Sequence, residues 1–176
     1  MNPAEPLSLE HRLIERMLRV MRREISNIKN SRAADVPVLS QCIDFLRVYA
    51  DRCHHGKEED ILFRALAGKT MRAEHTEMME QLIKEHQLGR HNVRHLDQAC
   101  RVYEQGNLAA LDEIIRNLEI LVDFYPKHID KEDNHFFTAC LDYFTDREQK
   151  ALLDQYATFD RKLIHEKYDR IVTALE

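Results

Sequence analysis

The chain has 176 residues and a formal net charge of −5 at pH 7; its length favours a single domain, and the acidic balance argues against nucleic acid as a partner. Hydrophobic residues make up 44% and charged residues 32% of the sequence, which excludes a disordered chain, and no apolar run approaches the ~18 residues of a membrane span. With four glycines and four prolines, the chain has too few turn residues for a β-rich fold and is expected to form long helices.

The first two predicted helices carry ionisable residues within their apolar stripes. Hydrophobic residues recur with helical spacing over residues 7–30, and His11 lies on that stripe. A second helix opens with a proline, which suits a first helical turn, and is expected to cover residues 37–68. His55 and Glu59 lie in line with its hydrophobic residues. Both helices are therefore expected to turn ionisable side chains toward the core.

The third and fourth predicted helices repeat this pattern. Helical spacing of apolar residues extends over residues 70–105, with His86 on the stripe, and a glycine then suits the end of the helix. The fourth helix is expected over residues 107–143, with His128 and Glu132 on its apolar face. A proline two residues before His128 predicts a kink just before that histidine.

A fifth helix is predicted for the C-terminal segment, because Thr145 and Glu148 form the sequence pattern of a capping box. Four long helices with short connections indicate an all-α fold, an up-down-up-down four-helix bundle. We expect this bundle to span residues 1–144, and the additional C-terminal helix, within residues 145–176, to pack on it in the same domain.

Two histidine–glutamate pairs in the predicted core indicate a metal site. His55 and Glu59 are four residues apart, as are His128 and Glu132, so each pair shares one face of a helix. An ionised carboxylate in a bundle core is costly unless it is paired or bound to a metal. The two pairs are therefore predicted to bind metal.

The other two helices each add one histidine at the same level. When residues are counted from the loop that joins each two consecutive helices, His11 and His86 lie within about one turn of the two pairs. One turn is roughly 5 Å along the bundle axis. The four helices should then bring four histidines and two glutamates together. Mixed imidazole and carboxylate ligands suit iron, manganese or zinc, and two carboxylates placed to bridge favour a site with two metal ions.

Three segments of this chain resemble one known family. HHGKEEDILF at residues 54–63, KEHQLGR around His86 and YPKHIDKEDNHFF at residues 125–137 are similar to the hemerythrin-like family, also called the HHE cation-binding domain. The resemblance covers about residues 7–144. It implies a four-helix bundle that holds two iron ions joined by an oxo or hydroxo bridge, with manganese or zinc as the alternative metals.

The resemblance also implies roles for individual residues. It assigns His11, His86 and His128 as ligands from the first, third and fourth helices. It assigns His55 and Glu59 to the HxxxE motif of the second helix, with Glu59 bridging the two ions.

The second bridging carboxylate is either Glu132 or Asp133. Oxygen-carrying hemerythrins use HxxxxD, which selects Asp133, whereas an F-box iron sensor and some bacterial proteins use HxxxE, which selects Glu132. We favour Glu132, because it shares the stripe of His128 while Asp133 is turned away by about 100°.

The third helix departs from the pattern of the oxygen carriers. They have HxxxH there, whereas this chain has Leu82 one turn before His86; its own HxxxH, His91 to His95, is predicted to face solvent. Four histidines would leave two of the twelve positions of two six-coordinate irons open. That count favours reaction with peroxide or nitric oxide over clean reversible oxygen carriage.

Other candidates are placed outside the metal site. His54 adjoins His55 and is expected to face elsewhere, and His75 lies about 16 Å from His86 along the helix. The remaining candidates, expected to lie in the core or outside the site, are Tyr49, Tyr125, Cys53 and His165.

These observations favour a cytoplasmic non-haem di-iron protein that handles O₂, peroxide or nitric oxide as its small-molecule ligand. Four cysteines without a CxxC motif indicate reduced thiols. If the protein is an enzyme, its expected activity is peroxide consumption or a reaction with nitric oxide or O₂. One alternative is an iron- or oxygen-responsive sensor that acts through a partner protein, and another is a structural bundle with incidental zinc. Neither nucleic acid nor a membrane is an expected partner.

Overall fold

The structure is a computed structural model that describes residues 2–160 and 162–176. Within these residues it contains helices and no strands, as predicted. No described helix combines the length and the apolar character needed to cross a membrane. The elements in chain order are α1 (Ala4–Ser31), α2 (Val36–Phe45), η1 (Leu46–His55), η2 (Glu58–Phe63), α3 (Arg64–Ala67), α4 (Ala73–Glu104), α5 (Ala110–Lys131), η3 (Glu132–Phe136), α6 (Phe137–Leu141), α7 (Asp146–Phe159) and α8 (Lys162–Leu175).

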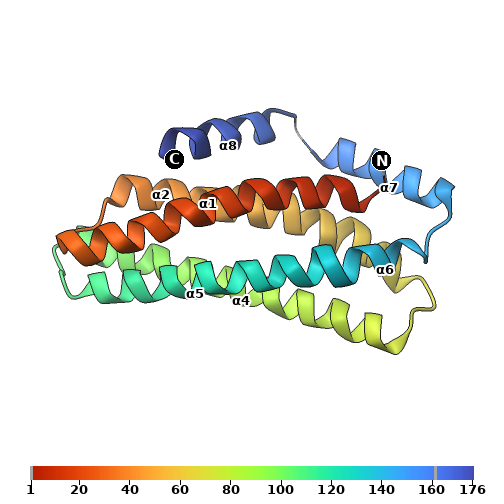
Figure 1. Cartoon of the computed structure of the whole chain (residues 1–176), viewed down its shortest axis with the longest axis horizontal. Coiled ribbons are helices and arrows are strands. Elements are labelled where there is room, and N and C mark those ends of the chain that lie inside the picture. The colour runs from red at the N-terminus through yellow and green to blue at the C-terminus, as the bar shows by residue number, and fades with distance from the viewer. Residues whose placement is uncertain (1, 161) are drawn as a thin grey trace.

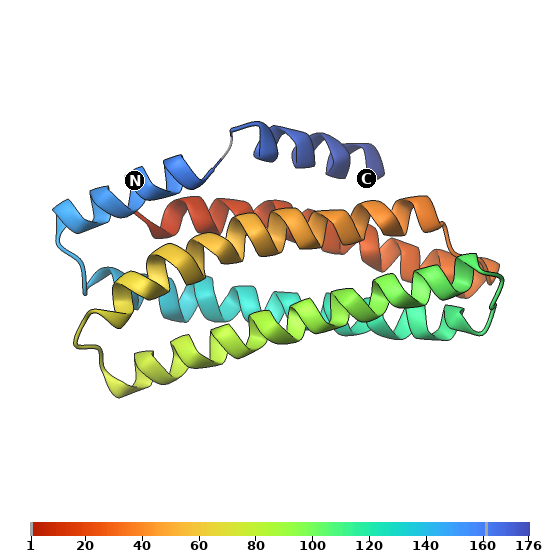
Figure 2. The same ribbon diagram turned by 180° about the vertical axis from the view of Figure 1, so that it is seen from behind.

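Four long helical runs lie side by side (Figures 1 and 2). They are α1, the run from α2 to α3, α4, and the run from α5 to α6. The C-terminal helices lie along the outside of these runs, where α8 contacts α1, α2 and η1, and α7 contacts η2. Tyr168 and Val172 of α8 are fully buried in the same apolar core as the long helices.

The apolar core is divided into two parts along the length of the molecule. On α1, Leu7 belongs to one part and Leu13 to the other, and the buried His11 lies between them. The other long runs change from one part to the other around three further buried histidines, His55, His86 and His128. A polar layer therefore crosses all four runs at one level, as the sequence predicts.

The helix ends follow their sequence signals. Thr145 and Glu148 form both hydrogen bonds of a capping box at the start of α7. Asp35 caps α2 by accepting a hydrogen bond from the amide of Val38 at 3.1 Å. Gly106 has a φ of +94° just after α4, a backbone conformation that glycine adopts without steric cost.

Two predictions about helix geometry are wrong. The second predicted helix is not one α-helix, because η1 and η2 are π-helical and bracket the HHGKEE segment. The fourth predicted helix is not one α-helix either: α5 continues through Pro126 to Lys131, and π-helical η3 and then α6 complete the run. The kink expected just before His128 stays a prediction. Pro126 has no amide hydrogen to donate to the carbonyl of Val122, and Arg22 donates to that carbonyl instead, at 2.9 Å.

The single C-terminal helix predicted from the sequence is also wrong, since the segment forms α7 and α8. Asp160 ends α7 with an extended backbone, at a ψ of 116°. Its carboxylate accepts hydrogen bonds from Lys57 Nζ at 2.6 and 2.7 Å and from Cys53 Sγ at 3.3 Å. These contacts to the second long run hold the chain between the two helices; Arg161 lies outside the described residues.

Candidate metal centre

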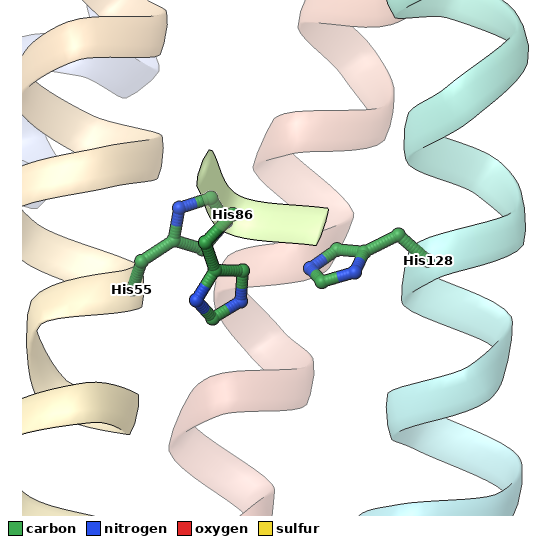
Figure 3. A group of neighbouring side chains, drawn as sticks. All are labelled: His55, His86 and His128. Atoms are coloured by element: carbon green, nitrogen blue, oxygen red, sulfur yellow. The ribbon is translucent and has the colours of Figure 1, made fainter. Parts of the chain in front are cut away.

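Seven buried side chains from the four long runs form two adjoining groups. In each group, ligand-type atoms lie within 4.8 Å of one another. The three-histidine group contains His55, His86 and His128, whose side chains extend from three separate helices into a shared space (Figure 3). The second group, which we call the two-histidine group, contains His11, His54, Glu58 and Glu132.

The inner atoms of these side chains have no hydrogen-bond partner. They are the Nε2 atoms of the five histidines and both carboxylate oxygens of Glu58 and Glu132. Several approach one another to 3.2–3.5 Å, but none of these pairs has hydrogen-bond geometry. A buried polar atom without a partner costs about 1–3 kcal/mol. So many in one place indicate a missing ligand rather than a packing defect.

The outer nitrogens of four histidines are fixed by carboxylates. In each, Nδ1 donates a hydrogen bond of 2.7–2.9 Å, so the ring is held with Nε2 toward the interior. This carboxylate–histidine arrangement orients metal-binding imidazoles in many proteins. The pairs are His11 with Asp133, His54 with Glu10, His86 with Glu59, and His128 with Glu85.

Glu58 and Glu132 each reach both groups. Glu132 places Oε2 3.2 Å from His11 Nε2 and Oε1 3.5 Å from His86 Nε2. Glu58 places Oε1 3.5 Å from His54 Nε2 and Oε2 3.4 Å from His86 Nε2. Each carboxylate thus directs one oxygen to each group, which is the arrangement that a bridging ligand requires.

The pKa values of Glu58 and Glu132 are shifted in opposite directions. Burial, and then the negative charge of Glu132, raise the pKa of Glu58 well above its usual range. Burial also opposes the charge of Glu132, but the charge of His128 and contacts with His11 and His86 hold its pKa well below the usual range. The chain alone therefore supplies too little positive charge for both carboxylates to ionise.

These donor atoms fit two metal ions. Two ligands of one octahedral ion at about 2.0–2.2 Å lie about 3 Å apart, which is close to the 3.2–3.4 Å between the inner atoms here. Burial and the neighbouring histidines push the pKa of His55 well below its usual range, so its imidazole is neutral, as a metal ligand must be. Imidazole and carboxylate together suit iron, manganese or zinc.

A comparison with known families agrees with this donor set. Residues 2–140 match the family model of the hemerythrin HHE cation-binding domain. The chain belongs to this family. No curated protein and no solved structure matches it. The hemerythrin HHE match runs from α1 to α6 and contains both groups, so the chain is a metal-binding helical domain.

Most of the predicted site residues of this hemerythrin HHE domain lie in the two groups, but Glu59 does not. Its side chain is 28% exposed and accepts hydrogen bonds from His86 Nδ1 and Arg90 Nη2, both at 2.7 Å. Asp133 likewise lies outside, beside His11 Nδ1, while Glu132 lies inside. The predicted residues inside the groups are His11, His55, His86, His128 and Glu132.

Sequence reasoning missed His54 and Glu58, and its expectation that His54 faces elsewhere is wrong. His54 is 1% exposed and Glu58 is fully buried. The motif HHGKEE contains two overlapping HxxxE pairs, so a signal for His54 and Glu58 was present. The π-helical turns of η1 and η2 are wider than α-helical ones, and they let both adjacent histidines face the interior.

The remaining candidates lie where the sequence places them, outside the two groups. His91 and His95 are both exposed. His75 Nδ1 pairs with the hydroxyl of Tyr143 at 2.7 Å. Cys53 is buried, and burial raises its pKa to about 12, so it is an inert thiol.

A second polar cluster adjoins the metal centre through Glu10. We call it the Lys57 cluster; Glu10, Cys53, Asp160 and His165 surround the fully buried Lys57. Lys57 Nζ donates to carboxylate oxygens of both Glu10 and Asp160, and His165 Nε2 lies 3.3 Å from Asp160 Oδ2. The four surrounding side chains could hold a metal, but the ammonium of Lys57 already supplies a cation there.

Proposed function

We propose that this chain is a non-haem di-iron protein that binds O₂, peroxide or nitric oxide within an up-down-up-down four-helix bundle. In this proposal the three-histidine group holds one iron, His11 and His54 hold the other, and Glu58 and Glu132 bridge them. The observation that carries it is the set of buried Nε2 and carboxylate oxygen atoms without a hydrogen-bond partner. Buried Tyr168 and Val172 support a single domain that includes residues 145–176.

Counting His54 changes the coordination arithmetic. Two six-coordinate irons offer twelve positions, of which bridging carboxylates fill four and an oxo bridge two. Five histidines then leave one position open, on the iron of His11 and His54, instead of the two open positions expected from four histidines. A single open position favours end-on binding of one small ligand. When bound, the irons supply redox chemistry at that position.

The chain's own residues hold this site rigid and dry. Carboxylates fix the tautomers of four histidines, as described above, and the seven inner side chains are at most 2% exposed. Aromatic rings form the walls: His11 stacks on Phe137 at 5.8 Å between ring centroids, and His86 stacks on Phe63 at 6.0 Å. Such walls exclude water and limit access to small molecules. Four free, buried cysteines support a reducing compartment, which we propose to be the cytoplasm.

The experiment is a visible absorption spectrum of the iron-loaded protein, followed by separate additions of O₂, hydrogen peroxide and nitric oxide. We expect charge-transfer bands of oxo-bridged iron that change with at least one of the three ligands and vanish in the Glu58→Gln variant. Protein that takes up zinc alone, or a spectrum without these bands, would contradict the proposal. Peroxide turnover no faster than that of free iron would exclude a peroxide-consuming enzyme.

One contact favours a sensor as the second candidate function. Glu10 accepts hydrogen bonds from His54 Nδ1 at 2.9 Å and from Lys57, and Lys57 in turn holds Asp160 just before α8. Metal bound by His54 would thus be linked to the position of the C-terminal helix. Hydrogen exchange of α8 should slow on iron loading if the protein is a sensor, and equal exchange in the two forms would exclude this route.

A further inference from the structure

A cavity of about 300 Å³ opens beside the three-histidine group. It lies between the run from α2 to η1 on one side and α4 and α5 on the other. We call it the arginine cavity; the lining residues on which the inference depends are Asp51, Arg52, His55, Gly89, Arg90 and Arg94. Its volume lies at the lower end of the range of small-molecule sites, about 300–1,000 Å³.

The lining of this cavity is positively charged, although the chain as a whole has a charge of −5. Asp51, the one carboxylate among the described lining residues, accepts a hydrogen bond of 2.7 Å from Arg90 Nε. Arg52 and Arg94 are exposed, and neither has a hydrogen-bond or ion-pair partner within the described part of the chain. Two guanidinium groups are therefore free to bind an anion at the mouth of the cavity.

His55 lines the cavity and has an unpartnered, buried nitrogen. His55 is 2% exposed, and its Nδ1 is buried without a hydrogen-bond partner. Asp51 Oδ1 lies 3.5 Å from this atom but is engaged by Arg90. Among the five described histidines of the metal centre, His55 is thus the one whose Nδ1 has no hydrogen bond to a carboxylate. If its Nε2 binds metal, its Nδ1 carries a hydrogen and requires an acceptor.

We propose that the arginine cavity binds a small oxyanion, a phosphate or carboxylate group. Its oxygens accept hydrogen bonds from Arg52 and Arg94, since guanidinium groups match the geometry of both anions, and the anion lies beside His55, which lines the same cavity. The bound anion would place negative charge beside His55, and would thereby tune the adjacent iron. The effect on His55 rests on the proposed function, because it requires metal bound by His55. Binding of the anion by the two arginines does not require metal.

The test is calorimetric titration of the full chain, metal-free and iron-loaded, with inorganic phosphate, acetate and glycerol 3-phosphate. Inorganic phosphate and glycerol 3-phosphate distinguish a free anion from the phosphate group of a metabolite. The double variant Arg52→Gln/Arg94→Gln removes the two free guanidinium groups, and Gly89→Leu fills the cavity without changing charge. The matched control, Arg147→Gln/Lys150→Gln, removes two exposed positive charges from α7.

We expect saturable binding of at least one anion, weakened about tenfold or more by the arginine variant and by Gly89→Leu, and unchanged in the control. In zinc-loaded protein, which is diamagnetic, the Nδ1–H resonance of His55 should shift on titration. Absence of saturable binding, or equal weakening in the arginine variant and the control, would overturn the proposal. Metal analysis of the same samples separates the two ideas, because failure to load metal contradicts the proposed function while the arginine dependence is still measured.

Discussion

The metal centre and the Lys57 cluster adjoin through the contact of Glu10 with His54, and they differ in the source of their positive charge. In the Lys57 cluster, burial opposes the charges of Glu10 and Lys57, but their contacts lower the pKa of Glu10 and raise that of Lys57. Both groups are therefore charged and satisfied by the chain itself. In the metal centre, the carboxylate oxygens of Glu58 and Glu132 have no hydrogen-bond partner, and burial together with the charge of Glu132 raises the pKa of Glu58 well above its usual range.

This difference teaches how to distinguish a metal site from an internal ion-pair network. Both clusters contain buried carboxylates and histidines at ligand-like distances, so residue type and proximity do not separate them. Whether the polar atoms are already satisfied does separate them. A cluster that contains its own ammonium is complete, whereas one whose inner atoms face one another without partners requires an ion from solution.

The largest expected effect is on metal binding in Glu58→Gln. The substitution removes a carboxylate that faces both groups and that would be ionised once metal binds, so we expect metal affinity to fall by roughly 10²–10⁴-fold, equivalent to about 3–5 kcal/mol. The measurement is competition for the metal with a chelator of known affinity.

The matched control is the same substitution one residue later. Glu59→Gln removes the hydrogen-bond partner of His86 Nδ1 and should reduce metal affinity about 10–100-fold with both ions retained. If Glu59→Gln lost metal and Glu58→Gln did not, the assignment of the inner carboxylate would be wrong.

The next largest effect is expected for Lys57→Met, which removes the internal cation while nearly preserving volume. Leaving the buried Glu10 and Asp160 without it should cost about 3–5 kcal/mol of unfolding free energy, measured by denaturant unfolding of metal-free protein. The variant should also bind one more zinc ion than the wild type. Lys150→Met, at an exposed position, is the control. Unchanged stability together with an unchanged zinc count would show that the ammonium does not take the place of a metal.

A smaller effect is expected from acid. Burial raises the pKa of Asp160, but hydrogen bonds with His165 and Lys57 lower it further, to about 2 from an ordinary 3.8. A depressed carboxyl pKa stabilises the fold above pH 3.8, and this stabilisation is lost as pH falls toward 2. We expect metal-free protein to lose at most about 2 kcal/mol over this range through Asp160. Asp160→Asn should lack this loss, and an equal acid dependence in both proteins would contradict it.

The smallest expected effect is that of His91→Gln/His95→Gln. Both histidines are exposed and lie outside the two groups. Metal content should therefore stay the same, and the unfolding free energy should change by less than about 0.5 kcal/mol. Metal analysis and thermal unfolding check this expectation. Loss of an ion from this variant would mean that the HxxxH pair of α4 contributes a ligand.

The sequence was sufficient to predict the four long helical runs and the level of the polar layer. Apolar residues with α-helical spacing mark each long run, and His11, His86 and His128 interrupt them at matching depths. Such periodicity is a strong signal, because burial of one helix face dictates it. The end of α4 and the capping box of α7 could also be predicted, because each depends on residues adjacent in sequence.

The sequence was not sufficient to identify which residues of the HHGKEE segment face the interior. Both histidines face the interior but only Glu58 of the two glutamates does, because the π-helical turns do not follow the spacing on which the prediction was based. The carboxylates that accept hydrogen bonds from the histidines could not be predicted either, because Glu10 and Glu85 contact His54 and His128 only when separate helices pack together.

The most direct test of the account is an anaerobic titration of the metal-free full chain with ferrous iron, with the bound ions counted per chain. The account predicts two ions per chain, because the proposed metal centre holds two and Lys57 already supplies the cation of its own cluster. Zero or one ion would contradict the two-metal assignment. Three ions would contradict the distinction between the two clusters.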